Sequence, residues 1–348
     1  MKEIVSQKIK NARVINALSQ QDLADMIGVS KQMISKYENG DSIPASSSLI
    51  KLAKSLNVKV DYFFSTNKIE LGTINFRKKS KFSVKKQNAL KELIKLKLES
   101  YIETEEILQI DYSFVNPLKS QQVNSLEEVE TVVFALRNVW QIGLDPIHNI
   151  IQLLEDNEIK VLEIDEEENL FDGLATIVND KFPVIVINKN FNVERKRFTL
   201  LHELGHLLLD LPECDVKTIE AYCNRFAAEF LFPMKSVIKE FGIKRDNISL
   251  TELIEVQKKY GISISAIVYR LVDAGVFSEG RQAEFYKKIN FSPDLKREVY
   301  KERFETPENS NRFEQLVYRA LSQELISSSK ASSLLNVNIN VIKERSLI

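Results

Sequence analysis

Residues 201–209 read Leu-His-Glu-Leu-Gly-His-Leu-Leu-Leu. This stretch contains the pattern H-E-x-x-H, with His202 and His206 four positions apart and Glu203 directly after the first histidine. On an α-helix, positions i and i+4 share a face, so the two imidazoles can bind one metal ion. A glutamate beside them is placed to accept a proton from a water molecule on that metal. The pattern therefore predicts a helix that carries a metal site and a general base.

The residues around this pattern indicate that its helix is mostly buried. A bare H-E-x-x-H also occurs in amphipathic helices whose histidines are solvated or packed. Buried polar groups without a partner cost on the order of 2–7 kcal/mol each, and Zn²⁺ is the partner that fits both histidines and the glutamate. The apolar residues that surround the pattern on nearly every side are Phe198, Leu200, Leu201, Leu204, Leu207, Leu208 and Leu209.

A third protein ligand is expected on the next helical stretch, Lys217 to Phe232. A catalytic zinc ion has three protein ligands and an open position for water. Glu220 and Glu229 are the candidates in this stretch, with Cys223 and Asn224 nearby. Cys223 is interpreted as either a redox-sensitive neighbour of the metal or a small core residue. The spacing alone does not decide among these residues.

Two segments, 197–206 (RFTLLHELGH) and 219–233 (IEAYCNRFAAEFLFP), resemble the ImmA/IrrE family of metallopeptidases. The resemblance implies that the third zinc ligand is Glu220, four residues before the asparagine of the N-x-F-A-A segment. It also implies a protein substrate, often a helix-turn-helix repressor. Glu229 falls where the family pattern tolerates other residue types, so we expect it to be a charge on the helix surface. Phe232 stands where the family usually has methionine, which is a conservative apolar change.

The composition bounds the class of protein. A chain of 348 residues is long enough for two or three domains, and 44% hydrophobic with 28% charged residues suits a globular protein. The sequence contains only 8 prolines and 10 glycines, and this low content favours a mainly helical (α+β) fold. The sequence contains neither an N-terminal apolar signal nor a run of 18 apolar residues, which argues against secretion and membrane insertion. The two cysteines, Cys214 and Cys223, are too few for the disulfide framework of a secreted protein, so we expect a cytoplasmic protein.

The charges of the chain are divided unevenly. Residues 1–100 contain 19 basic and 9 acidic residues. The rest of the chain contains 29 of the 48 basic residues and 40 of the 49 acidic residues. The excess of basic residues in the N-terminal segment suggests that this segment binds nucleic acid.

Residues 1–66 predict a bundle of five short helices. Ser19 and Ser30 are placed to cap two consecutive helices, with Asp22 at the capping-box position and Gly28 in the turn between them. The patterns S-Q-x-x-L-A-x-x-x-G-V-S and I-S-x-x-E-N-G resemble the XRE family of helix-turn-helix proteins. In that fold the second helix of the pair enters the DNA major groove with its N-terminal residues.

The resemblance to XRE proteins implies a double-stranded DNA operator and a homodimer on two half-sites. Lys31, Gln32 and Lys36 are candidates for base edges, because lysine pairs with guanine and glutamine with adenine. A helical adaptor that does not bind DNA is the alternative. The neighbouring Ser30 and Ser35 are added to these candidates, as are Gln20 and Asn39, which match positions at which the family holds phosphates. The DNA-binding candidates are therefore Gln20, Ser30, Lys31, Gln32, Ser35, Lys36 and Asn39.

The sequence predicts four regions: a DNA-binding domain (residues 1–66), a basic helical connector (residues 67–116), a metallopeptidase domain (residues 117–290) and a helical C-terminal region (residues 291–348). The connector is interpreted either as a solvated amphipathic segment or as a non-specific phosphate contact. No function can be read from the C-terminal region. The lysines that would contact phosphates in the connector are Lys78, Lys79, Lys81, Lys85 and Lys86.

Three short runs rich in β-branched residues, 160–164, 173–178 and 183–188, predict a small three-stranded sheet before the metal helix. An edge strand beside the metal can pair with the backbone of an extended substrate. We expect the run Pro183–Asn188 to have that role, with a plain strand of the sheet core as the alternative. His148, the one histidine outside the pattern, is expected to be a surface or packed residue and not a ligand.

These observations predict a DNA-binding regulator with zinc-dependent peptidase activity, in which Mn²⁺ could replace Zn²⁺. Glu203 would take a proton from the attacking water and pass it to the leaving amine. The cleaved protein would be a repressor or an antitoxin whose loss controls stress, mobile-element or defence genes. The alternatives are a regulator whose peptidase-like domain is a sensor with little turnover, or one half of a toxin-antitoxin pair.

Overall fold

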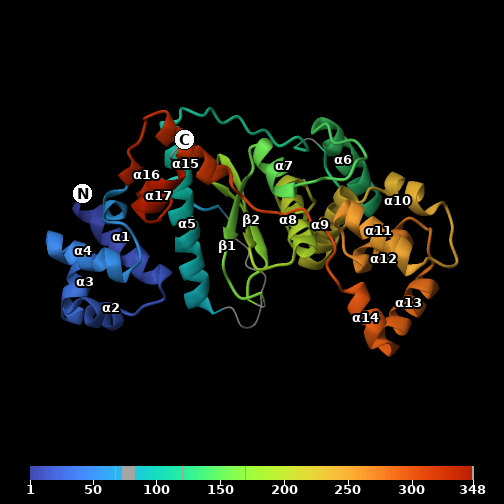
Figure 1. The fold of residues 1–348 in the computed structure, drawn as a ribbon, viewed down its shortest axis with the longest axis horizontal. Helices are drawn as coiled ribbons and strands as arrows, with labels where there is room; N and C mark the ends of the chain where they lie inside the picture. The colour runs from blue at the N-terminus through green and yellow to red at the C-terminus, as the bar shows by residue number, and fades with distance from the viewer. Residues whose placement is uncertain (67, 73–82, 120, 169, 347–348) are drawn as a thin grey trace. The chain divides into compact units, whose positions relative to one another are not determined.

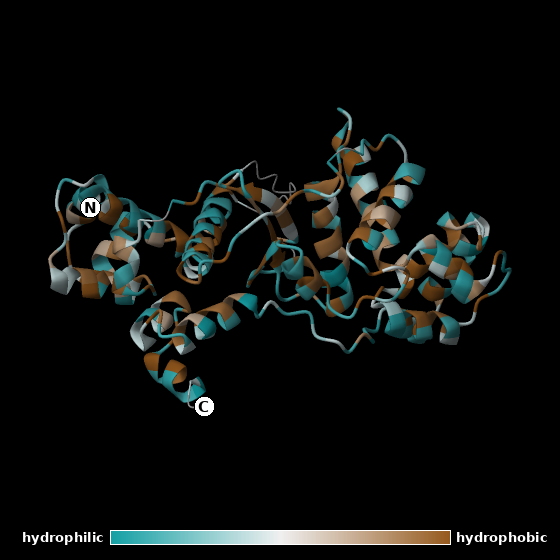
Figure 2. Cartoon of the chain, turned by 90° about the horizontal axis from the view of Figure 1, so that it is seen from above, coloured by the Kyte–Doolittle hydropathy of each residue, from teal (hydrophilic) through white to brown (hydrophobic). Residues whose placement is uncertain are grey.

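The computed structural model describes residues 1–66, 68–72, 83–119, 121–168 and 170–346. The fold is mainly helical with one small three-stranded sheet, as the sequence predicts (Figure 1). Most helices combine hydrophilic and hydrophobic residues (Figure 2), which is typical of amphipathic helices around a core. None of the helices in these ranges is both long and apolar enough to cross a membrane. Of the five connector lysines predicted to contact phosphates, the structure describes Lys85 and Lys86, whereas Lys78, Lys79 and Lys81 lie outside the described residues.

The chain divides into two compact units. The described residues of the first unit lie within 1–112 and 311–346, and those of the second unit lie within 113–310. The second unit is therefore inserted into the first, because the chain returns to the first unit after residue 310.

The first unit begins with five short helical elements. Side chains cap α2 and α3 as expected, because Ser19 and Asp22 form a capping box and the Ser30 hydroxyl accepts a hydrogen bond from the backbone N–H of Met33. Gly28, with φ +74°, forms the turn between these two helices in a left-handed conformation that favours glycine. These caps and this turn produce the helix-turn-helix. The five elements are α1 (Lys2–Ile15), α2 (Gln20–Ile27), α3 (Lys31–Asn39), α4 (Ser46–Ser55) and the 3₁₀-helix η1 (Val60–Phe64).

The first unit is completed by a long helix and by the C-terminal helices. α5 (Val84–Ile107) contributes Ile107 at its end, next to Leu108, to a small apolar cluster with the C-terminal residues. Lys330 also pairs with Glu103 of α5 at 2.5 Å. The C-terminal helices are α15 (Arg312–Ser322), α16 (Ser328–Leu334) and α17 (Ile339–Arg345).

The second unit contains the sheet, in the order β1-β3-β2. β3 (Phe182–Asn188) is central, parallel to β1 (Lys160–Ile164) and antiparallel to β2 (Gly173–Val178). The expectation that Pro183–Asn188 forms the edge strand is therefore wrong. Both sides of β3 are occupied by ladder hydrogen bonds, and β2 is the edge strand that packs against the metal-motif helix.

The helices of the second unit pack around one large core with the sheet. α8 (Val193–Leu208) carries the H-E-x-x-H pattern, and α9 (Val216–Leu231) packs along it. Asn192 caps the start of α8 and Asp215 caps the start of α9. The other helices are α6 (Leu126–Val139), α7 (Ile150–Asp156), α10 (Met234–Phe241), α11 (Leu250–Tyr260), α12 (Ile264–Asp273), α13 (Glu279–Phe291) and α14 (Pro293–Val299).

Candidate metal centre and DNA-binding helices

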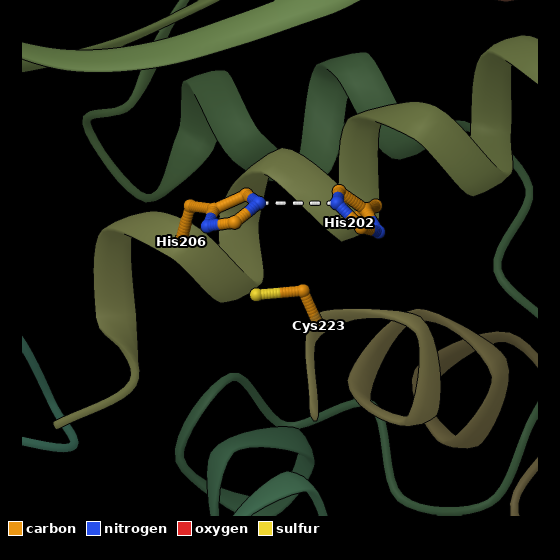
Figure 3. A group of neighbouring side chains, drawn as sticks. All are labelled: His202, His206 and Cys223. Atoms are coloured by element: carbon orange, nitrogen blue, oxygen red, sulfur yellow. Dashed lines mark hydrogen bonds between the residues drawn. The ribbon is translucent and has the colours of Figure 1, made fainter. Parts of the chain in front are cut away.

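Three predicted ligands converge between α8 and α9. The Nε2 atoms of His202 and His206 lie 3.1 Å apart, as drawn in Figure 3. Glu220 places one carboxylate oxygen 3.4 Å from Nε2 of His202 and the other 3.3 Å from Nε2 of His206. The structure thus brings together residues that lie up to 18 positions apart in the sequence.

These separations suit a tetrahedral metal ion. Bonds of 2.0–2.2 Å from zinc to nitrogen and oxygen place neighbouring ligand atoms about 3.3 Å apart. The separation of 3.1 Å between the two Nε2 atoms is close to this value, and each histidine has a different oxygen of the Glu220 carboxylate at 3.3–3.4 Å. The residues present therefore fit a zinc ion, and their role as ligands stays a prediction.

The candidate centre is buried on one side and open on the other. His202 is 2% exposed and Glu203 4% exposed, whereas the side chains of His206 and Glu220 are 26% and 30% exposed. The buried side therefore holds His202 and Glu203 within the core, whereas the side of His206 and Glu220 is accessible from solvent.

Asn224 orients the first histidine. Its Oδ1 atom lies 2.8 Å from Nδ1 of His202, so the amide oxygen can accept the Nδ1–H and leave Nε2 directed at the other ligands. From the sequence, Asn224 is expected near the metal but has no assigned role. The sequence feature that could have predicted this role is the spacing of four between Glu220 and Asn224, since this spacing puts both side chains on the face of α9 that meets α8.

Glu203 lies beneath the edge strand. A Cβ atom at Gly173, in β2, would lie 3.2 Å from Cγ of Glu203 and 3.2 Å from Cγ2 of Thr199. Gly173 therefore provides the space in which strand and helix approach each other, and it places the edge strand β2 directly against the predicted general base.

Glu229 is not a charge on the helix surface, and this expectation is wrong. The residue is 4% exposed, and its carboxylate accepts hydrogen bonds from the guanidinium of Arg270 and from the backbone N–H of Met234 at 3.0 Å. Burial raises the pKa of this carboxyl, and Arg270 opposes that rise. α12 supplies the arginine, so only the tertiary packing shows that Glu229 is internal.

Two further side chains of this unit are Tyr222, on α9, and His148. The Tyr222 hydroxyl donates a hydrogen bond to the carbonyl oxygen of Asn124 at 2.8 Å. His148 is exposed, as expected.

The DNA-binding candidates lie on α2 and α3. Lys31, Gln32 and Lys36 are exposed on α3, as residues that read base edges must be. Gln20 donates a hydrogen bond to the buried carboxylate of Glu38 at 2.8 Å, which holds it at the start of α2.

The remaining candidates have local roles in the folded chain. The hydroxyl of Ser30 caps α3, and the amide of Asn39 lies 3.5 Å from the hydroxyl of Ser35. These bonds fix the start and the end of the helix that would enter the groove. The contacts of all seven candidates with DNA stay predictions.

The fold defines two classes of domain in one chain: a helix-turn-helix, and a domain whose helix α8 carries the H-E-x-x-H pattern. Residues 9–63 match the family described as "Helix-turn-helix", and residues 155–272 match the family described as "IrrE N-terminal-like domain". The chain belongs to the XRE-type helix-turn-helix transcriptional regulators and carries an IrrE-like peptidase domain.

Similar proteins include regulators and a metalloprotease. An uncharacterized transcriptional regulator in the ATPase CF(0) region of Rhodospirillum rubrum is 46% identical over 61 residues, which are 18% of this chain and 56% of that protein. An uncharacterized HTH-type transcriptional regulator of Methanocaldococcus jannaschii is 37% identical over 60 residues, 17% of this chain and 91% of that protein. The radiation response metalloprotease IrrE of Deinococcus radiodurans is 35% identical over 104 residues, 26% of this chain and 31% of that protein.

The match spans about half of the R. rubrum regulator and about a third of IrrE. Among solved structures, PlcR of Bacillus thuringiensis in complex with the peptide PapR7 and DNA aligns over 99% of each chain at 16% identity and a TM-score of 0.18. A TM-score of 0.18 is too low to carry an inference about this chain.

Proposed function

We propose that this chain is a DNA-binding transcriptional regulator with metal-dependent peptidase activity that cleaves a partner protein, such as a repressor. The observation that carries the proposal is the convergence of His202, His206 and Glu220, whose nitrogen and oxygen atoms lie 3.1–3.4 Å apart, with Glu203 on the same helix as the two histidines. A site that only stabilised the fold would have no use for a carboxylate beside the first ligand.

Each residue of the centre has a distinct role in this proposal. A bound zinc ion would polarise the scissile carbonyl and lower the pKa of its water. His202, His206 and Glu220 would hold the ion, and Asn224 would keep the first imidazole in the correct tautomer. Glu203 would accept the proton of the water and deliver it to the leaving amine.

The substrate would bind as an extended strand along β2. Its inner side pairs with β3, and no described strand pairs with its outer side. An edge strand offers backbone N–H and C=O groups to an added strand. Because Gly173 in β2 lies against Glu203, a peptide on this edge would pass beside the general base.

The helix-turn-helix would bring this activity to DNA. The exposed N-terminal residues of α3, Lys31 and Gln32, would contact base edges in the major groove. The regulator would thereby act at the promoter at which the cleaved partner also acts.

The test is a comparison of the full chain with Glu203→Gln, both loaded with Zn²⁺ and incubated with the product of the neighbouring gene. Wild type should cleave this protein, and Glu203→Gln should bind one zinc ion equally well but lose cleavage by at least about a hundredfold, on the order of a general-base effect. Glu213→Gln, an exposed glutamate outside both metal helices, is the matched control and should cleave normally. Equal regulation in cells by wild type and Glu203→Gln would favour a sensor domain without turnover.

A further inference from the structure

The C-terminal helices repeat the pattern of the first three helices of the chain. Ser19 caps α2, and Ser327, 308 positions later, caps α16. Ser30 caps α3, and Asn338, at the same interval, caps α17. A further helix precedes each pair, α1 in the N-terminal segment and α15 in the C-terminal segment. Residues 312–345 therefore have the helix order of the helix-turn-helix.

The turns between the capped helices also agree. Gly28 follows α2 with φ +74°, and Asn336, 308 positions later, follows α16 with φ +51°. Both are left-handed conformations, which glycine adopts without strain and asparagine more readily than most residues. The next residue is a partly buried valine in each segment, Val29 and Val337. The chain therefore turns from α16 into α17 through the same kind of residue as it does from α2 into α3.

Buried positions recur at the same interval. In each segment they come from all three helices and form an apolar core. An ion pair joins the first helix of each segment to the third, Arg13 with Glu38 and Glu314 with Arg345. Equal spacing of inward-facing residues along helices of the same order favours the same packing. The matched buried pairs, each residue at most 5% exposed, are Ile9 and Val317, Ala12 and Ala320, Leu23 and Ala331, Ala24 and Ser332, and Ile34 and Ile342.

α5 holds both segments within the first unit. Lys8 of α1 pairs with Glu99 of α5, and Lys330 of α16 pairs with Glu103 of α5 at 2.5 Å. Glu99 and Glu103 are four positions apart, so both ion pairs lie on one face of this helix. One compact unit therefore carries both helix pairs.

The outer face of α17 suits DNA. Ile342 is buried like Ile34 of α3, so the exposed residues of α17 correspond to the face of α3 that is predicted to read base edges. Ile339 is 37% exposed, and Lys343 is also exposed. An apolar side chain can contact the methyl group of thymine, and a lysine can contact guanine or a phosphate. Apart from Ile339, α17 exposes only polar and charged residues, so it lacks the apolar centre of a protein interface.

We propose that residues 312–345 form a second helix-turn-helix and that α17 binds double-stranded DNA through Ile339 and Lys343. The chain then contacts its operator at two places, through α3 and through α17. This inference rests on the proposed DNA binding of the first helix-turn-helix, and it is independent of the metal centre.

DNA selected from a random pool with the full chain tests the proposal. The double variant Ile339→Ala/Lys343→Ala should bind the selected DNA about tenfold or more weakly in fluorescence anisotropy at fixed salt. Competition with single base-pair changes in the selected site should show that this variant and Gln32→Ala lose their preference at different positions. Ile243→Ala/Lys244→Ala, an exposed isoleucine and lysine of the second unit, is the matched control and should bind like wild type.

The salt dependence of binding provides a second measurement. Lys343→Ala should lower the slope of the logarithm of affinity against the logarithm of salt concentration by about one if the lysine contacts a phosphate, and Lys343→Arg should restore it. Wild-type DNA binding by Ile339→Ala/Lys343→Ala, with a loss in Gln32→Ala, would overturn the role of α17 and leave the first helix-turn-helix intact. A loss of self-association in sedimentation velocity, with normal DNA binding, would assign α17 to a protein contact and also overturn the proposal. If wild type enriches no DNA sequence, the proposed DNA recognition by both helices is wrong.

Discussion

Nδ1 of His202 lies 2.8 Å from the amide oxygen of Asn224, so a residue of α9 sets the orientation of an imidazole of α8. The same face of α9 presents Glu220 to Nε2 of this histidine at 3.4 Å. One helix therefore supplies both a predicted ligand and the partner that directs another ligand, which makes the packing of α8 on α9 the basis of the candidate centre.

The first prediction concerns this hydrogen bond. Asn224→Ala should lower the affinity for Zn²⁺ by about tenfold to a hundredfold, because the imidazole of His202 loses the partner that fixes its tautomer. Competition with a fluorescent chelator measures this change. Asn340→Ala, at an exposed position of α17, should leave the affinity unchanged. Equal affinities for all three proteins would show that Asn224 does not position the ligand.

The second prediction concerns DNA recognition by α3. Gln32→Ala should weaken binding to a DNA site selected by this protein by about 1–3 kcal/mol, and it should change binding to random DNA little, because a base contact carries sequence information. Fluorescence anisotropy at fixed salt measures both affinities. Gln21→Ala, an exposed glutamine of α2 that bonds Asp25, is the control. A uniform loss on both DNAs would indicate a phosphate contact instead.

The third prediction concerns the buried ion pair of Glu229 and Arg270, whose side chains are 6% and 0% exposed. Glu229→Ala should lower the free energy of unfolding by about 3–5 kcal/mol, since the buried guanidinium of Arg270 loses its closest carboxylate and keeps only the longer pairs with Asp273 at 3.3 Å and Glu130 at 3.7 Å. Urea unfolding followed by the fluorescence of Trp140, in the same unit, measures this loss. Glu255→Ala removes an exposed pair with Lys258 and should cost less than about 1 kcal/mol. Similar losses for both variants would place Glu229 in a solvated environment.

The fourth prediction concerns pH and the capping box of α2. The backbone N–H of Ser19 and then its hydroxyl lower the pKa of Asp22 below the ordinary 3.8. A lowered pKa in the folded state contributes stability that is present above the unfolded pKa and is lost as the pH falls through the folded pKa. Asp22→Ala should therefore have a lower unfolding temperature than wild type near pH 7, and the difference should shrink below about pH 4.

Differential scanning calorimetry from pH 3 to pH 7 measures this difference. Asp25→Ala, on the same helix outside the capping box, serves as the control for a lost surface carboxylate. A difference between wild type and Asp22→Ala that stays constant down to pH 3 would contradict the role of the carboxylate.

The sequence by itself determined the local features of this protein. The i, i+4 spacing places His202 and His206 on one face of a helix, and Ser19 and Ser30 mark the starts of α2 and α3. These features depend on residues a few positions apart, and the geometry of a single helix relates them.

Only the tertiary structure decided which distant residues meet. It made β3 the central strand, buried Glu229 against Arg270, and returned residues 311–346 to the unit of the helix-turn-helix. It also placed Cys223 beside both histidines. The order of strands and the partner of a buried charge depend on packing between segments that are far apart in the sequence. Sequence periodicity does not relate such segments, because the energies of burial and pairing are set by contacts across the fold.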